Sequence, residues 1–420
     1  MEKKSVSKSG VEIYQYKNPS LHGFFISLFL RSGSMYESCE DGGITHFFEH
    51  VSIRNINKLM PGGLYSELDK RGIEFNASTY SEMVQFYVSG AMHSFDFAAD
   101  VITKLFSPIV LDKSEIDVER RRIKAEIRES DERTSLLSFT NSIVHEGTSL
   151  SRPITGTLGG VSKINAKRLE AFRREAFSAD NIFFYVTGNF TDENIESLIS
   201  KIDAYDLPRG KKNDNMAPIP ERFLNRGGEV RVKGSDFTMV RFTFDLDMSE
   251  LSVPETDLVY DQLLSGYNSH FFIEMSENRG LFYDLTGAVE RYRNMGQLYF
   301  SYEVREKDLL PAIEMTVEIL KSFKENTLAE GEILKAGYVD NANLLYDDMR
   351  EFNFTMAYDN HIMCLGYGSL EDRVNAYDSV SAEDIRAAAE KIFKSDNLTL
   401  TIKGSKKIDT GSIESIIGKL

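Results

Sequence analysis

The sequence predicts an α+β fold of two homologous domains, each with helices packed on one face of a sheet. Its 420 residues exceed the roughly 250 to 300 over which one hydrophobic core grows, so two domains are expected. Residues 164–188 match residues 380–404 without a gap, and strand patterns at 23–31 and 238–246 lie near the start of each half. Each half therefore has the order strand, strand, long helix, strands, helices, strand, which is typical of an antiparallel or mixed sheet.

The two copies of the repeat have the same order of predicted elements, at a constant offset of 216 residues. Each copy begins with an N-cap residue, Asn165 or Ser381, and continues with a helical pattern. An Asp-Asn turn then leads into an apolar β run that ends at Gly. Identical pairs are Ala166/Ala382, Phe177/Phe393, Asp180/Asp396, Asn181/Asn397 and Gly188/Gly404. Chance similarity of two helix-turn-strand units is the alternative, and the ungapped match favours a true repeat.

A linker is predicted between the halves. Residues 206–220 contain three of the nine prolines, together with charged residues and Gly, which is typical of linker composition. We therefore predict a first domain at 1–212 and a second, homologous domain at 213–420.

Composition excludes several classes of function. With 49 basic and 65 acidic side chains, the net charge of −16 argues against nucleic-acid binding, because a phosphate backbone is bound by Lys and Arg. The two cysteines, Cys39 and Cys364, have no metal spacing and form no disulfide framework, which favours a reducing compartment. The start of the chain has no signal-peptide pattern, and no run of about 18 apolar residues occurs. We expect a cytoplasmic protein that binds neither nucleic acid nor a membrane.

The strongest chemical motif is His-Phe-Phe-Glu-His at residues 46–50. On a helix, His46 and His50 lie about 40° apart on one face, and Glu49 lies about 60° from His46. Two neutral imidazoles on one face suit Zn²⁺, and the adjacent carboxylate can accept a proton from an attacking water. The order H-x-x-E-H is that of the inverzincins. A chance pair of core histidines is the alternative, although the chain has only seven histidines.

A third ligand is expected, because catalytic zinc usually takes three protein ligands and keeps one open position. A helix predicted over 115–133 places Glu119 and Glu126 in one sector with two isoleucines, and its bases fall opposite. A carboxylate on the apolar side is costly unless it is paired or bound to metal. An ordinary ion pair with Arg122 is therefore an equally open alternative for these acids.

These residues resemble the pitrilysin/insulinase family of zinc peptidases, most closely its short-chain branch, which includes the mitochondrial processing peptidase β subunit. In that family the third ligand is a Glu about 76 residues beyond the second motif His, and another Glu lies seven residues before it. Here Glu126 lies 76 residues after His50 and seven after Glu119. The resemblance implies that His46, His50 and Glu126 bind Zn²⁺ and that Glu119 is a supporting catalytic acid.

Two further segments support the resemblance. Residues 72–79 resemble the family's Gly-x-x-x-Asn-Ala-x-Thr strand, which accepts substrate as an added β-strand, so Asn76 and Ala77 are implied to bind substrate. Loose alternation over 75–88 independently fits an edge strand, which can add a peptide through main-chain hydrogen bonds, and a plain sheet strand is the alternative. Residues 151–157 resemble the family's Pro-x-x-Gly-Thr segment.

The second half departs from the family pattern. Family members have an Arg and, seven residues later, a Tyr that hold substrate at the zinc. Tyr283 matches the Tyr, but Ser276 stands at the Arg position, with Arg279 in the same loop. The resemblance implies that this chain is half of a clamshell chamber. We expect a heterodimer whose related subunit supplies the missing Arg, and a homodimer is the alternative.

The predicted function is a zinc-dependent endopeptidase that hydrolyses short or unfolded peptides inside a dimeric chamber. Glu49 acts as the general base and later returns the proton to the leaving amine. A narrower version is the maturation of one dedicated peptide. The alternative is a non-catalytic core or scaffold subunit of a peptidase-like complex, which the intact His46, Glu49, His50 and Glu126 disfavour.

Overall fold

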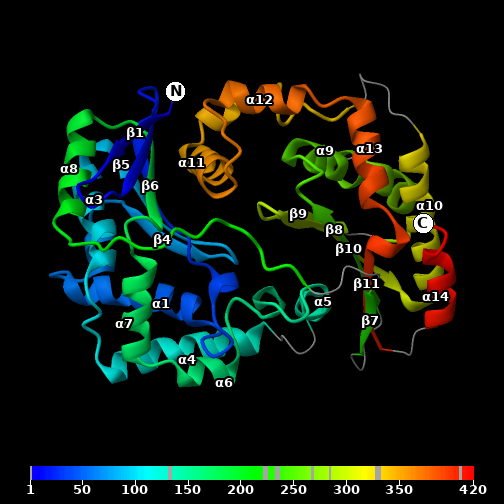
Figure 1. Ribbon diagram of the computed structural model, residues 1–420, viewed down its shortest axis with the longest axis horizontal. Coiled ribbons are helices and arrows are strands. Elements are labelled where there is room, and N and C mark those ends of the chain that lie inside the picture. The colour runs from blue at the N-terminus through cyan, green and yellow to red at the C-terminus, as the bar shows by residue number, and fades with distance from the viewer. Residues whose placement is uncertain are drawn as a thin grey trace. The chain divides into compact units, whose positions relative to one another are not determined.

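The protein folds into two compact α+β units, seen in a computed structural model (Figure 1). The structure describes residues 2–130, 135–220, 226–231, 237–265, 269–282, 285–326, 333–405 and 409–420. The first unit contains residues 1–130, 152–215 and 343–370, and the second contains 131–151, 216–342 and 371–420. The α+β class is confirmed. The domain boundary predicted between residues 212 and 213 stays a proposal, because the compact units do not follow it. Residues 131–151 belong to the second unit, and residues 343–370 belong to the first.

The first unit is built on a six-stranded sheet in the order β1-β2-β6-β3-β5-β4. The strands are β1 Lys3–Val6, β2 Glu12–Lys17, β3 Gly23–Leu30, β4 Glu74–Thr79, β5 Val84–Ala91 and β6 Ile182–Gly188. The central strands β3 and β6 are almost entirely buried, which explains their continuous apolar sequences. β4 lies at one edge and, among the described strands, pairs with β5 alone.

Helices cover both faces of the central strands of the first sheet. They are α1 Ile44–Leu59, α2 Leu64–Asp69, α3 Phe95–Thr103, α4 Lys113–Glu129, α6 Leu158–Lys163, α7 Ala166–Ala176, α8 Asp192–Asp203 and α11 Met349–Ala357. α11, orange in Figure 1, lies beside β6 although it comes from the second half of the sequence. There Asn353 accepts a hydrogen bond from the Ser27 hydroxyl at 2.7 Å and donates to the Tyr185 carbonyl at 2.9 Å.

Within the described residues, the second unit repeats five strands of the first sheet, β2 to β6, in the order β7-β11-β8-β10-β9. Its strands are β7 Arg226–Arg231, β8 Phe237–Asp247, β9 Leu285–Arg291, β10 Met295–Arg305 and β11 Leu398–Gly404. Its helices are α5 Leu136–Val144, α9 Val253–Leu264, α10 Leu309–Glu325, α13 Ala382–Ile392 and α14 Thr410–Ile417, and α12 Leu370–Asp378 begins at the unit boundary. The strands predicted at 23–31 and 238–246 are the equivalent strands β3 and β8.

The predicted repeat is confirmed residue by residue. α7 and α13 are both 11 residues long, β6 and β11 are both seven, and each pair is separated by 216 positions. The turn between helix and strand is also held in the same way in the two copies. The Asn181 side-chain amide donates to the Ala176 carbonyl, and the Asn397 amide donates to the Ile392 carbonyl.

In the described part of the chain, no helix combines the length and apolar character needed to cross a bilayer.

Candidate metal centre

The start of α1 is fixed by two glycines that lie against each other. Gly43 caps the helix with φ 90°, and a Cβ there would lie 2.7 Å from the Thr155 carbonyl oxygen. Gly156 has φ 74°, and a Cβ there would lie 2.6 Å from the Gly42 carbonyl oxygen. Only glycine adopts these conformations at such close approach. The Pro-x-x-Gly-Thr segment therefore holds the helix that contains the two motif histidines.

A half-buried carboxylate, Glu37, completes this helix start. The Glu37 side chain accepts hydrogen bonds from the backbone N–H groups of Gly43 at 2.8 Å and Thr45 at 2.9 Å. These N–H groups have no partner within the helix, and a negative charge is favourable at its N-terminus. Burial raises the pKa of Glu37 to about 7, although both backbone hydrogen bonds act in the opposite direction.

α1 and α4 bring the two histidines and Glu126 together. His46 Nε2 lies 3.6 Å from Glu126 Oε2, and His50 Nε2 lies 3.6 Å from Glu126 Oε1. One ligand atom from each residue lies within 4.8 Å of the other two, and this is the one such His/Cys/Asp/Glu group among the described residues. Donor atoms 2.0 to 2.2 Å from a tetrahedral zinc would be about 3.3 Å apart. The observed spacing therefore fits Zn²⁺ after small side-chain shifts.

The protonation of the histidines differs with their surroundings. Burial, with a smaller effect from His50, lowers the pKa of His46 to about 4, so its imidazole is neutral at pH 7. A neutral imidazole is the form that binds a metal. Burial also acts to lower the pKa of His50, but the carboxylates of Glu119, Glu126 and Glu49 outweigh it and raise that pKa.

Glu49 is held on the same helix by a residue from the edge strand. The Thr79 hydroxyl at the end of β4 donates a hydrogen bond of 2.5 Å to Glu49 Oε2. Burial raises the pKa of Glu49, and the Thr79 hydrogen bond partly offsets this rise. A carboxylate with a raised pKa exchanges protons more readily near neutral pH, which is the property of a general acid or base.

Glu119 contacts both a candidate ligand and two bases. Its side chain is 2% exposed, and its Oε2 lies 3.5 Å from His50 Nδ1. Arg54 Nη1 donates to Glu119 Oε1 at 2.8 Å, and Arg122 Nη1 donates to it at 3.1 Å. Burial acts to raise the pKa of Glu119, but His50 and the two bases outweigh it and lower that pKa. Both alternatives for this acid, ion pairing and support of a ligand, therefore occur in the structure.

We expect Glu119→Gln to weaken zinc binding by about 10- to 100-fold, because a carboxylate that fixes the second ring nitrogen orients a ligand histidine. Zinc affinity measured by competition with a chromogenic chelator checks this. Arg122→Gln is the matched control, since it removes one of the two ion pairs of Glu119, leaves its contacts with Arg54 and His50, and should change the affinity less than about threefold. Equal losses in the two variants would assign Glu119 to ion pairing alone.

Most of the site residues predicted in the first half lie near this cluster, although they come from elements that are far apart in the sequence. Glu126 and Glu119 are on α4, where Ile116, Ile123 and Ile127 are buried as the helical pattern predicted. A small pocket of about 150 Å³ adjoins the cluster and is lined in part by Glu49, His50 and Arg54.

Asn76 and Ala77 lie on the edge strand β4, opposite Tyr87 and Phe86 of β5. The Ala77 N–H donates to the side-chain oxygen of Asn76 at 2.9 Å. The edge position agrees with the sequence analysis, and substrate binding by these two residues stays a prediction.

The structure describes some of the residues of the second half that the sequence analysis connected with substrate holding. Ser276 lies in a short π-helix, Phe272–Glu277, and Arg279 follows it with an exposed side chain. Tyr283 lies outside the described residues.

Sequence reasoning missed two contributors to the site, Thr79 and Arg54. Thr79 ends the Asn-Ala-x-Thr segment, so the segment contained a signal, but only the fold shows that its hydroxyl reaches Glu49. Arg54 lies one turn after His50 on α1, and its contact with Glu119 depends on how α1 packs against α4.

Comparison with known proteins assigns the chain to a family. The model for insulinase (peptidase family M16) matches residues 15–158, and the model for the peptidase M16 inactive domain matches residues 163–336. The uncharacterized zinc protease YmxG of Bacillus subtilis is 21% identical over 94% of this chain and 97% of its own length. Mitochondrial-processing peptidase subunit beta of Dictyostelium discoideum is 23% identical over 56% of this chain and 50% of its own.

Solved structures share the fold. A protease from Helicobacter pylori superposes with a TM-score of 0.85 at 14% identity, over 96% of this chain and 99% of that one. The periplasmic protease PqqL from Escherichia coli superposes with a TM-score of 0.80 at 15% identity, over 99% of this chain and 50% of that one. The two family models together match residues 15–158 and 163–336, which is more than half of the chain, and this chain therefore belongs to the insulinase (M16) family of peptidases.

Proposed function

We propose that this protein is a zinc-dependent endopeptidase that hydrolyses short or unfolded peptides. The proposal rests on one observation, the meeting of His46, His50 and Glu126 within 4.8 Å of one another on α1 and α4. Glu49 lies on α1 between the two histidines in sequence. Relatives named zinc proteases support the same metal.

In this proposal His46, His50 and Glu126 hold Zn²⁺, which when bound acidifies a water and polarises the scissile carbonyl. Glu49 accepts the proton of the attacking water and then donates it to the leaving amine nitrogen. Thr79 keeps the Glu49 carboxylate in one orientation through the 2.5 Å hydrogen bond. Glu119 positions the His50 ring from the opposite side.

The edge strand β4 is the proposed place for the substrate backbone. Its outer edge has no neighbouring strand in the described part of the sheet, so its main chain can pair with an extended peptide. Its last residue, Thr79, already contacts Glu49. A peptide paired along β4 beside Asn76 and Ala77 would therefore extend toward the proton-transferring carboxylate. Strand pairing of this kind requires an unfolded segment, which is the basis for proposing short or unfolded substrates.

We propose that the working enzyme is a dimer with an enclosed chamber. This chain corresponds to half of PqqL in length. Because Ser276 occupies the position of the expected Arg, the proposed partner is a related subunit that supplies the Arg, and a homodimer is the alternative. Tyr283 is the proposed substrate-holding residue of this chain. The mass of the isolated chain, and of the chain co-expressed with a relative, measured by size-exclusion chromatography with light scattering, tests this. An active homodimer would contradict the heterodimer.

We place the enzyme in the cytoplasm, because both cysteines, Cys39 and Cys364, are exposed free thiols. Exposed unpaired thiols persist more readily in a reducing compartment. Processing of one dedicated peptide is the narrower form of the same proposal.

The decisive experiment combines zinc analysis with peptide cleavage. We expect about one zinc per chain by elemental analysis, and cleavage of an unstructured peptide pool that EDTA abolishes and zinc restores. The second candidate function is a non-catalytic scaffold subunit, and the observation that raises it is the match of residues 163–336 to the model for the peptidase M16 inactive domain. Bound zinc without cleavage, even beside the partner, would support the scaffold.

A further inference from the structure

The turn between α7 and β6 in the first unit binds an extended segment of the chain, residues 208–213. Arg209 Nη1 donates to Asp180 Oδ1 at 2.8 Å, and the Gly210 N–H donates to Asp180 Oδ2 at 2.9 Å. Farther along the segment, the Asn213 N–H donates to Asn181 Oδ1 at 3.1 Å. The Asp180–Asn181 turn is thus a receptor for a basic, extended peptide.

Two further hydrogen bonds hold the segment at its two ends. The Ala179 N–H donates to the Pro208 carbonyl at 2.8 Å, and the Asn213 side chain donates to the Arg31 carbonyl at 2.6 Å. Gly210 lies so close to Ser178 that an added Cβ would fall 2.5 Å from its side chain. The contact in the first unit thus combines main-chain hydrogen bonds, a close backbone approach at Gly210 and an exposed ion pair at Arg209, and in the second unit Lys394 stands at the position of Ser178.

The second unit has the equivalent turn and keeps one of its internal hydrogen bonds. Asn397 donates to the Ile392 carbonyl at 2.8 Å, as Asn181 does to Ala176, and also to the Asp245 carbonyl at 2.9 Å. The counterpart of the Arg31 carbonyl is the Asp245 carbonyl, which Asn397 already fills, whereas the exposed Asp396 carboxylate and the half-buried Asn397 side-chain oxygen differ from their first-unit counterparts. Among the described residues, neither the Asp396 carboxylate nor Asn397 Oδ1 has a hydrogen-bond or ion-pair partner.

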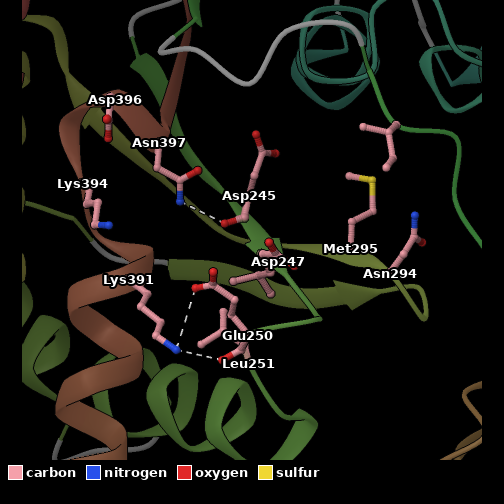
Figure 2. Close-up of a pocket in the computed structure, with 12 residues that line it drawn as sticks. Asp245, Asp247, Glu250, Leu251, Asn294, Met295, Lys391, Lys394, Asp396 and Asn397 are labelled. Carbon is pink, nitrogen blue, oxygen red and sulfur yellow. Dashed lines mark hydrogen bonds and ion pairs between the residues drawn. The ribbon is translucent and has the colours of Figure 1, made fainter.

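A pocket of about 470 Å³ lies at this second turn, where the first unit has its bound segment. Its volume falls within the range of about 300 to 1,000 Å³ found for ligand sites. Figure 2 shows Asp396 and Asn397 beyond the end of α13, with Asn397 bound to the backbone carbonyl of Asp245 on β8, and all three residues line the pocket.

The charge of the pocket favours a basic occupant. Four carboxylates, Asp245, Asp247, Glu250 and Asp396, lie beside two lysines, Lys391 and Lys394. Lys391 is already engaged, since its Nζ donates to the Glu250 carbonyl at 2.9 Å and lies 3.9 Å from the Glu250 carboxylate. The segment bound in the first unit has the complementary composition, with Arg209, Lys211 and Lys212.

We propose that the pocket at Asp396 and Asn397 docks a basic, extended segment of a partner polypeptide, in the way the first unit docks residues 208–213. The partner segment pairs an Arg or Lys with Asp396, presents the next backbone N–H to the same carboxylate, and donates a later N–H to Asn397 Oδ1. The same segment of a second copy is not the occupant, because residues 208–213 are held at their own turn. The inference does not depend on zinc chemistry.

The test uses the full chain and a fluorescent synthetic peptide with the sequence of residues 207–213, Leu-Pro-Arg-Gly-Lys-Lys-Asn. We expect saturable binding by fluorescence polarisation, and at least a tenfold weaker affinity for Asp396→Asn. Glu414→Gln is the control, since it removes an exposed carboxylate elsewhere in the second unit and should leave the affinity unchanged. Thermal melting checks that both variants fold.

A scrambled peptide of the same composition separates recognition from net charge. We expect it, and the peptide with Glu in place of Arg209, to bind at least tenfold more weakly. The proposal is overturned by no binding up to about 1 mM peptide, by equal binding of the scrambled peptide, or by an unchanged affinity of Asp396→Asn. An oligomer of the chain alone that dissociates in Asp396→Asn would overturn it too, by making a second copy the occupant.

Discussion

Replacing Glu49 by Gln should lower the turnover number for peptide cleavage by at least about 10³-fold and leave zinc bound. General acid–base groups contribute roughly 10² to 10⁴-fold to rate, and Glu49 is proposed both to take the proton from water and to return it. Gln has nearly the same shape, and its side-chain oxygen can still accept the hydrogen bond from Thr79. The substitution therefore removes the basic group without opening a cavity in α1.

The measurement pairs steady-state kinetics on a cleaved peptide with elemental analysis of the same sample. Glu129→Gln, at the exposed end of α4, is the control and should retain full activity. A Glu49→Gln variant with full activity would show that another group transfers the proton. A variant that lost zinc as well would assign Glu49 to metal binding instead.

The histidine half of the site was predictable because its geometry is local. His46 and His50 are one helical turn apart, and α1 spans both, so their shared face follows from helix periodicity alone. Helix periodicity alone did not predict Glu126 as the third ligand. Helical periodicity placed it near the apolar face of α4, but an ion pair explained that placement equally well, and only the family spacing singled it out as a ligand.

Other parts of the site depend on contacts that local patterns do not encode. Thr79 reaches Glu49 only because β4 returns along the sheet edge beside α1. No local pattern indicated that α11 would cover β6. The buried Asn353 on α11 binds the carbonyl of Tyr185, which lies 168 positions away in the sequence. Local propensity and helix or strand periodicity describe one element at a time, so pairings between distant elements emerge only with the tertiary structure.

The repeat was also predictable in its elements but not in its contacts. Matching residues at an offset of 216 predicted two copies of one helix-turn-strand unit, and the bounds of α7, α13, β6 and β11 agree with it. What each turn contacts was not predictable, because the conserved pair Asp-Asn is identical in both copies. The difference arises from the linker, which folds back over Asp180 in the first unit.

Replacing Glu126 by Gln should remove zinc, in contrast to Glu49→Gln. A neutral amide is a poor zinc ligand, and two histidines alone leave fewer than the three protein ligands usual in catalytic sites. We expect zinc affinity to fall by at least about 10³-fold, more than the 10- to 100-fold expected for the outer carboxylate Glu119. The Glu126 side chain is 42% exposed, so the substitution should scarcely change the melting temperature of the metal-free protein.

Chelator competition measures the zinc affinity, and Glu129→Gln on the same helix is again the matched control. The two predictions constrain each other. If Glu49 is the base and Glu126 a ligand, one variant keeps zinc without cleavage and the other loses both together. Zinc affinity unchanged in Glu126→Gln would leave His46 and His50 in need of a different third ligand, and would return Glu126 to the ion-pair alternative that its place on a charge-rich helix first suggested.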